Sequence, residues 1–470
     1  MTRKILHIII ISIIAFLFGC ATTVEEDVPD SATDLPAAED DDEAVLTIPD
    51  AYDAISLAVQ VGDPEAAIAA YEEAQLEDPD NPEAQVLLAN LYLVAGQIEE
   101  AEAILTSVLE EDPSNADALY LQSLLFGVRG QRDEQKALLE RIVQERPENA
   151  QAQAALGELY LEDRNYRAAE QALRAAVSAD EQNLVARVGL GNLYLRRERW
   201  EDAEEQLTAA IEIDSEYSFA YADRARARTQ QYELSAADRD LTAALSLDPD
   251  YYWHYIDRGR VRLEQRRYEL AATDFERAVA IDDARFIGHL LFARATDANG
   301  EYEAALPLYE RALSIRPDYA PAYPQIAVIY YMFEQFDQAE RYFEAAHEDQ
   351  SSIYEYALLA ALAMKQADRN EEARRYLLGL VNFLPRDSIM YHMMRYYIDP
   401  RSESLVLTIL RDERDKITQA RMYFYLGEQM HILDRKRTAE ASFSRAEAEL
   451  QPGFVEQRLA AWRLRSYGSE

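Results

Sequence analysis

One spacing organises most of this sequence, because prolines recur with a constant period of about 34 residues or multiples of it. They stand at Pro79, Pro113, Pro147, Pro249, Pro317 and Pro385. A second position of the same period nearly always holds a small residue, as at Ala89, Ser123, Gly157, Gly191, Ala225, Gly259, Ala293, Ala327 and Ala361. Twelve residues further lies another small residue, and four beyond that a large apolar one, as in Ala271 and Phe275. A period kept for so long predicts repeated copies of one structural unit.

Each unit has the pattern of two amphipathic helices joined by a short turn. The two small residues allow the helices to cross closely, the large residue fills the space between them, and the proline ends the unit. A single pair of helices cannot bury its apolar face, so the units must stack on one another. The sequence therefore predicts an all-α protein built as a solenoid.

The pattern closely resembles the tetratricopeptide repeat (TPR) family. The match holds almost position by position in ALGELYLEDRNYRAAEQALRAAV (155–177) and GLGNLYLRRERWEDAEEQL (189–207). It covers residues 48–386 as about ten units. The resemblance implies a right-handed α-solenoid of helix-turn-helix units, in which the first helix of each unit lines a concave groove that binds peptides of partner proteins.

The period fails after residue 386. Residues 387–419 are expected to form an irregular pair of helices. Residues 420–470 are expected to form a final TPR unit, followed by a helix containing Trp462 that caps the stack.

The N-terminus combines positive charge, an apolar run and a cysteine. MTRK precedes an apolar stretch over 5–18 that is too short for a comfortable membrane span, and Leu17-Phe18-Gly19-Cys20 closes it. This order resembles the signal peptide and lipobox of bacterial lipoproteins. It implies a signal peptide over 1–19 and lipidation of Cys20, the only cysteine of the chain. A secretory signal with a chance cysteine is the alternative.

The segment that follows is strongly acidic. Between Ala21 and Asp50 there are 11 acidic residues and no basic ones, so residues 20–47 are expected to be a disordered tether. Ala21, rather than aspartate, follows the cysteine, which favours the outer membrane and a periplasmic location over inner-membrane retention. The inner membrane and the cell surface stay open as alternatives. Contact with the membrane would be through the lipid anchor only.

Charge and motif content exclude several functions. The chain has 87 acidic against 47 basic residues and a formal net charge of -40, so nucleic-acid phosphates would be repelled. No HExxH motif is present, and GLGNLY at 189–194 has Tyr194 where a dinucleotide-binding loop needs its third glycine. We therefore expect no cofactor, no metal site and no enzymatic activity.

Arginines nevertheless cluster twice in this acidic chain. DRARAR occupies residues 223–228, and DRGRVR follows one period later at 257–262. The groove-facing position next to the small residue holds arginine in three consecutive units, at Arg226, Arg260 and Arg294. With helices packed about 8–10 Å apart, these side chains would form a positive stripe that binds acidic or carboxylate groups of a partner.

Two interpretations of the stripe stay open. Each arginine has an aspartate three residues away: Asp223, Asp257 and Asp297. That spacing places both charges on one helix face, so the arginines either neutralise their own helices or bind a partner. Asn192, at the same groove position one unit earlier, and Trp253 are further candidate contacts. The aromatic run that contains Trp253 either packs against its neighbours or forms a platform for a sugar or peptide.

The leading functional hypothesis is a lipid-anchored scaffold or adaptor that holds partner proteins or peptides in its groove. The alternative is a structural accessory component of a cell-envelope machine for outer-membrane assembly, pilus biogenesis or polysaccharide export. A third hypothesis, an enzyme or carbohydrate binder, would require a ligand at the aromatic cluster.

Overall fold

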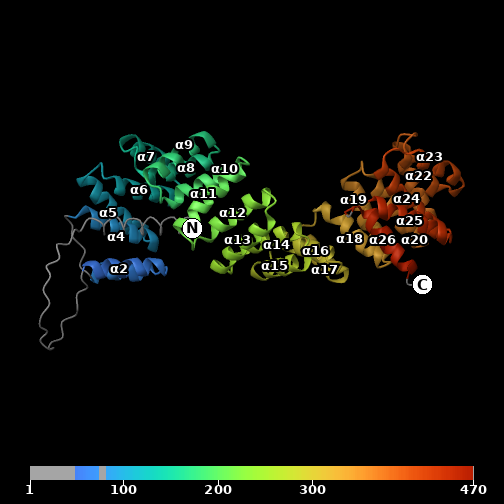
Figure 1. Ribbon diagram of the computed structural model, residues 1–470, viewed down its shortest axis with the longest axis horizontal. Coiled ribbons are helices and arrows are strands. Elements are labelled where there is room, and N and C mark those ends of the chain that lie inside the picture. The colour runs from blue at the N-terminus through green and yellow to red at the C-terminus, as the bar shows by residue number, and fades with distance from the viewer. Residues whose placement is uncertain (1–47, 74–80, 452, 469–470) are drawn as a thin grey trace, which may run out of the picture. The chain divides into compact units, whose positions relative to one another are not determined.

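The protein is helical throughout the part described by the computed structural model, which comprises residues 48–73, 81–451 and 453–468. Within these ranges there are α-helices and short 3-10 helices and no strands, so the all-α prediction is confirmed. The chain divides into two compact units at Pro249 and Asp250, the boundary between two repeats. Figure 1 labels the helices of both units in chain order. The predicted signal peptide, Cys20 and the predicted tether lie outside the described residues.

Unit 1 consists of consecutive helix pairs. Its helices are α2 (Ile48–Gln60), α3 (Pro64–Glu73), α4 (Pro82–Ala95), α5 (Ile98–Glu111), α6 (Ala116–Val128), α7 (Arg132–Glu145), α8 (Ala150–Glu162), α9 (Tyr166–Ala179), α10 (Leu184–Arg196), α11 (Trp200–Ile213), α12 (Ser218–Gln230) and α13 (Leu234–Leu247). Even-numbered helices are the first, and odd-numbered helices the second, of each repeat.

Unit 2 continues the pairs and then departs from them. Its helices are α14 (Tyr252–Glu264), α15 (Tyr268–Ile281), α16 (Phe286–Ala298), α17 (Tyr302–Ile315), η1 (Ala320–Ala322), α18 (Tyr323–Met332), α19 (Phe336–Asp349), α20 (Tyr354–Gln366), α21 (Asn370–Leu380), η2 (Val381–Phe383), α22 (Ile389–Ile398), η3 (Pro400–Ser402), α23 (Glu403–Asp412), α24 (Lys416–Ile432), α25 (Lys436–Glu449) and α26 (Val455–Gly468). Here too α14, α16, α18, α20 and α24 are first helices.

Asparagine caps mark the start of the first helices in unit 1, at the same period as the prolines. Asn81, Asn115, Asn149 and Asn183 each accept a hydrogen bond from a backbone N–H in the first turn of α4, α6, α8 and α10. Such caps satisfy donors that have no partner inside the helix and contribute about 1 kcal/mol each. They were not among the features singled out from the sequence.

The predicted fit between small and large residues is confirmed. A Cβ atom added to Gly157, on a first helix, would lie 2.5 Å from Cγ of Leu173 on the second helix of the same unit. Gly259 stands in the same relation to Phe275, and Gly427 to Phe443, the Phe rings being fully buried. The small residue is therefore required because the large side chain occupies the space that its Cβ would need.

Gly259→Ala is expected to destabilise unit 2 by about 1–3 kcal/mol, since the added methyl group would lie 2.5 Å from a ring atom of Phe275 and overpack the core. Gly379→Ala, at an exposed position of α21 with no neighbour within 4 Å, is the matched control. It should be neutral or stabilising by up to about 1 kcal/mol, the difference in helix propensity. Urea unfolding followed by circular dichroism measures both; equal effects would contradict the packing argument.

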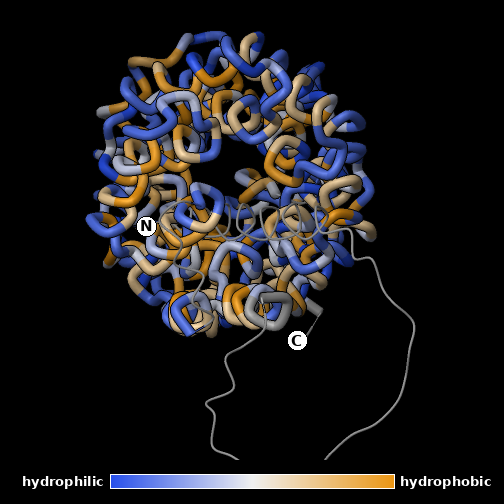
Figure 2. The backbone as a smooth tube through the Cα atoms, turned by 90° about the vertical axis from the view of Figure 1, so that its left-hand side faces the viewer, coloured by the Kyte–Doolittle hydropathy of each residue, from blue (hydrophilic) through white to orange (hydrophobic). Residues whose placement is uncertain are grey.

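Apolar and polar residues alternate around the helices, as the amphipathic pattern requires (Figure 2). In unit 2 one cluster of buried apolar side chains extends from α16 to α26. Among the described residues, none of the helices is both long and apolar enough to span a bilayer.

The C-terminal helix does more than cap the stack. We expected the helix that contains Trp462 to close the end of the repeats, and α26 does pack against α24 and α25. It also reaches back to α18, so that the Trp462 and Tyr331 ring centroids lie 5.9 Å apart. The helix α26 therefore does more than close the end of the repeats, because it also contacts α18, the first helix of an earlier repeat.

Candidate interaction face

The DRARAR motif holds two helices of one repeat together. Arg224 and Arg228 lie four residues apart on α12, and both reach Asp240 on α13, with nitrogen–oxygen distances of 2.8 Å. Arg224 makes a second bond to the same carboxylate at 3.0 Å, and Arg228 also binds Glu204 on α11 at 2.8 Å. Only 6% of the Asp240 side chain is exposed. These arginines thus belong to the interior of unit 1.

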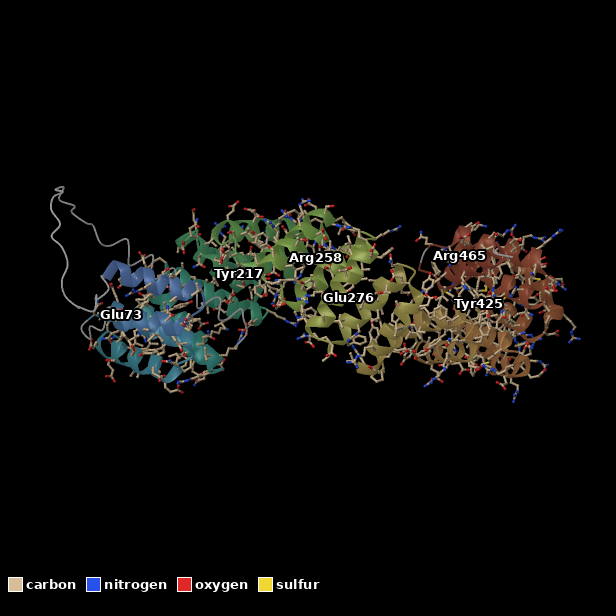
Figure 3. The ribbon with its side chains drawn as sticks, turned by 90° about the horizontal axis from the view of Figure 1, so that it is seen from below. Glu73, Tyr217, Arg258, Glu276, Tyr425 and Arg465 are labelled. Atoms are coloured by element: carbon tan, nitrogen blue, oxygen red, sulfur yellow. The ribbon has the colours of Figure 1, made fainter. Side chains whose placement is uncertain are left out.

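The same arrangement recurs one repeat later, in unit 2. Arg258 and Arg262 on α14 bind Asp274 on α15 at 2.7 and 2.8 Å (Figure 3 labels Arg258). We call this arrangement, in which two arginines of a first helix bind one aspartate of the second helix, the arginine clamp. Asp240 and Asp274 are one period apart, so the recurrence of these aspartates could have revealed the arginine clamp in the sequence. Local spacing alone did not, because the partners are on different helices.

The middle arginine of each motif is exposed and pairs with its own helix. A nitrogen of Arg226 is 3.1 Å from Asp223, and one of Arg260 is 3.9 Å from Asp257. Their side chains are 54% and 49% exposed, so each pair contributes only about 0.3–0.5 kcal/mol. The neutralisation hypothesis thus describes these two arginines, and their contact with a partner stays a prediction. Arg226 belongs to unit 1, so the stripe through both units also stays a prediction.

Arg294 differs from the other two. Its expected partner Asp297 is bound by Arg458 of α26, with distances of 2.6 and 3.1 Å between the guanidinium nitrogens and the carboxylate oxygens. Within the described residues Arg294 has no hydrogen bond or ion pair. The expectation that Asp297 neutralises Arg294 is therefore wrong, because a cation from the C-terminal helix takes the carboxylate.

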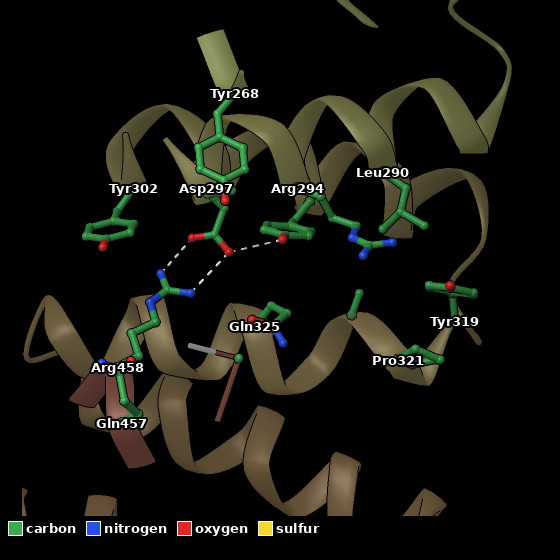
Figure 4. Close-up of a pocket in the computed structure, with 14 residues that line it drawn as sticks. Tyr268, Leu290, Arg294, Asp297, Tyr302, Tyr319, Pro321, Gln325, Gln457 and Arg458 are labelled. Atoms are coloured by element: carbon green, nitrogen blue, oxygen red, sulfur yellow. Dashed lines mark hydrogen bonds and ion pairs between the residues drawn. The ribbon is translucent and has the colours of Figure 1, made fainter. Parts of the chain in front are cut away.

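Arg294 lines a pocket of about 630 Å³ within unit 2 (Figure 4). The pocket lies between α16, α18 and the start of α26, and four tyrosines line it: Tyr268, Tyr302, Tyr309 and Tyr319. The amide side chains of Gln325 and Gln457 face the same space. One unpaired guanidinium among aromatic and amide groups suits a carboxylate that carries an apolar or aromatic neighbour.

Asp297 is held in the pocket by hydrogen bonds from Tyr309 and Arg458. Burial, reinforced by the Asp297 carboxylate, raises the pKa of Tyr309 well above its ordinary value, so this hydroxyl keeps its proton and donates to Asp297 at 3.2 Å. The Arg458 guanidinium also lies over the ring of Tyr302, 4.6 Å from its centroid. Asp297 is thus satisfied on both oxygens, which leaves Arg294 as the group that can receive an anion.

Further along the same face, α26 forms a buried ion pair with α24. Arg463 donates to both carboxylate oxygens of Glu428 at 3.0 Å, and Glu428 is fully buried. Glu428 also accepts hydrogen bonds from Tyr331 and Gln366, each at 3.1 Å. Burial alone lowers the pKa of Arg463, but the Glu428 carboxylate outweighs it and raises that pKa above its ordinary value. Arg463 therefore stays charged in the interior of unit 2.

A third charged residue of α26, Glu456, also forms an ion pair with α24. Glu456 is 2.8 Å from Arg421 on α24 and accepts a hydrogen bond from Tyr425 at 2.9 Å (Figure 3 labels Tyr425). Arg421 in turn pairs with Glu355 on α20 at 2.6 Å. We call the surface formed by α16, α18, α20 and α24, on which α26 lies, the inner face of unit 2.

The remaining predicted contacts have ordinary surroundings. Asn192 is half-buried on α10. Trp253 is 38% exposed, and the guanidinium of Arg285 lies over its ring at 5.5 Å, with Tyr252 packed edge-on at 5.1 Å. Trp253 thus packs against its neighbours and keeps an exposed part, and the contact of Asn192 and Trp253 with a partner stays a prediction. No cluster of His, Cys, Asp and Glu suited to a metal ion occurs within the described residues.

Stacked helix pairs of constant length define a solenoid repeat protein. A TPR family model matches residues 58–125, 160–229 and 298–362, and a second TPR model matches 120–183 and 256–321. Together these segments cover more than half of the chain. The protein belongs to the tetratricopeptide repeat family, as the sequence pattern predicted.

Several solved structures are similar. A TPR protein from Parabacteroides merdae is 23% identical over 53% of this chain and 97% of its own, with a TM-score of 0.36. The pilF protein of Pseudomonas aeruginosa is 18% identical over 50% of this chain and 92% of its own, with a TM-score of 0.33. YrrB, described as a TPR protein with an unusual peptide-binding site, is 17% identical over 38% and 93%, with a TM-score of 0.35. A search of curated protein sequences finds no match.

Proposed function

We propose that this protein is a lipid-anchored scaffold of the bacterial cell envelope, which binds a partner protein or peptide through the pocket at Arg294. Its anchor would be Cys20 and its location the periplasmic side of the outer membrane, as the lipobox-like N-terminus and Ala21 suggest. The TPR fold, whose known members bind proteins and peptides, supports the scaffold function. That the protein is not an enzyme remains a prediction.

One observation supports the site itself. Arg294 is exposed in a pocket of about 630 Å³ and has no ion-pair partner in the described part of a chain with a net charge of -40. An unpaired guanidinium is able to hold a carboxylate with two parallel hydrogen bonds. The tyrosines around it supply contact area and hydroxyl groups at little cost in conformational entropy. The partner is therefore expected to present an acidic side chain or a C-terminal carboxylate.

Arg294→Glu is expected to reduce capture of the partner at least about tenfold, because it replaces the anion-binding group with a like charge. Arg294→Lys should give a smaller loss, since lysine cannot form the two parallel bonds. The measurement is quantitative pull-down from detergent-solubilised envelopes with the full chain as bait.

The matched control is Arg277→Glu, the same charge reversal at an arginine of α15 that is 53% exposed. Circular dichroism confirms that both variants keep their helices. Equal capture by the parent chain and Arg294→Glu would overturn the site, and equal loss in both variants would assign the effect to net charge.

A further inference from the structure

The inner face of unit 2 carries acidic groups at groove positions. Glu428 follows the small residue Gly427, the register that Arg294 has after Ala293. Asp297 and Tyr331 are one period apart and share a second register on the same face. All three are contacted by α26, through Arg463 and Arg458. The C-terminal helix thus lies where the repeat pattern predicts that a ligand binds.

The contacts of α26 are those of a charge-matched ligand. Glu456, Arg458 and Arg463 each form an ion pair with a first helix of this face, and Arg458 and Arg463 both do so with two nitrogens. The fully buried apolar residues of α26 are few: Leu459 and Ala460. Trp462, Leu464 and Tyr467 add partly buried apolar contacts with the core of unit 2, so apolar packing holds the helix and the spacing of its charges determines which helix fits.

We propose that the inner face of unit 2 is a helix-binding surface, and that a partner helix with the pattern Glu-x-Arg-x-x-x-x-Arg replaces α26 on it. The inference goes beyond the proposed function, because Gln457 and Arg458 of α26 help to line the Arg294 pocket and a helix that replaces α26 would take their place there. Asp297 and Glu428 select for the arginines: a helix without them would bury two carboxylates unpaired, at a cost far above that of a lost surface contact.

The connection to α26 permits such a replacement. The segment between Glu449 and Val455 is short and contains Gly453, which is exposed and has a φ of 118°. Its short length keeps α26 at a high effective concentration next to the face, so a free helix competes with a tethered one. Binding of the partner is therefore weaker than the intrinsic affinity of the face, and it becomes measurable when the tether is cut.

The experiment cuts the tether after folding. A protease recognition sequence is inserted between Gln451 and Phe454 of the full chain, which is purified, cut and mixed with a fluorescent peptide of residues 453–468. Fluorescence anisotropy should show that the peptide replaces the cut α26 and binds at least about tenfold more tightly than to the uncut chain. A control peptide with Arg458→Glu and Arg463→Glu should not bind.

Two results would overturn the proposal. One is retention of α26 by the cut chain with no labelled peptide bound, and the other is equal binding of parent and control peptides. An uncut chain with Arg458→Ala and Arg463→Ala, shown by circular dichroism to be folded, gives a second test, since it should bind the parent peptide more tightly than the unmodified chain does. Because no outside partner is used, this outcome is independent of the Arg294 pull-down.

Discussion

Glu428→Ala is expected to lower the free energy of unfolding of unit 2 by about 3–5 kcal/mol. The Arg463 side chain is only 7% exposed, and the substitution leaves this guanidinium buried without its carboxylate. Tyr331 and Gln366 lose a hydrogen-bond acceptor at the same time. The measurement is urea unfolding followed by the fluorescence of Trp462, the neighbour of Arg463, with Trp200 and Trp253 replaced by phenylalanine.

Arg463→Ala added to Glu428→Ala gives the control for this effect. Once both charges are gone, no unpaired ion is buried, so part of the loss should be recovered. Two results would contradict the buried ion pair. One is a loss of unfolding free energy below about 1 kcal/mol in Glu428→Ala, and the other is a loss in the double variant equal to the sum of the losses in Glu428→Ala and in Arg463→Ala alone.

Asp240→Ala should destabilise unit 1 by a similar amount, about 3–5 kcal/mol. Asp240 is buried and joins Arg224 and Arg228 of α12 to α13. Its removal leaves Arg224, 13% exposed, without a carboxylate, whereas Arg228 keeps Glu204. Urea unfolding with Trp200 of α11 as the only tryptophan reports on unit 1.

Glu145→Ala is the matched control in the same unit. It removes an exposed ion pair with Arg141 at 2.9 Å on α7 and should cost less than about 0.5 kcal/mol. Equal losses of unfolding free energy in Asp240→Ala and Glu145→Ala would contradict the conclusion that the arginines of DRARAR stabilise the interior of unit 1 through Asp240.

Much of the fold was predictable because it is periodic. The position of Gly259 opposite Phe275 follows from a spacing in the sequence that recurs between Gly157 and Leu173. A spacing of this kind indicates which helices pair and which side of each helix packs against its partner. With the resemblance to the TPR family, the first helices could therefore be assigned to the groove. The position of Arg294 in the lining of the pocket is consistent with this assignment.

The contacts that give the site its charge were not predictable from local spacing. In an isolated helix the spacing of Arg294 and Asp297 would favour an ion pair between them. In the folded protein Arg458 binds Asp297 instead, although the two residues are 161 positions apart in the sequence. Likewise, α26 lies beyond the last repeat and carries no periodic signal. Its charged residues are visible in the sequence, but only the fold shows that Glu428 of α24 pairs with Arg463.

Site-specific photocrosslinking tests the central claim, that a partner binds at the Arg294 pocket, most directly. A benzophenone side chain is placed at Gln325, which lines the pocket, or at Gln338, an exposed position on the second helix α19. We predict a crosslinked partner from position 325 that is lost when Arg294→Glu is added, and none from position 338. Crosslinks from 338 alone, or adducts at 325 that persist in Arg294→Glu, would contradict the claim.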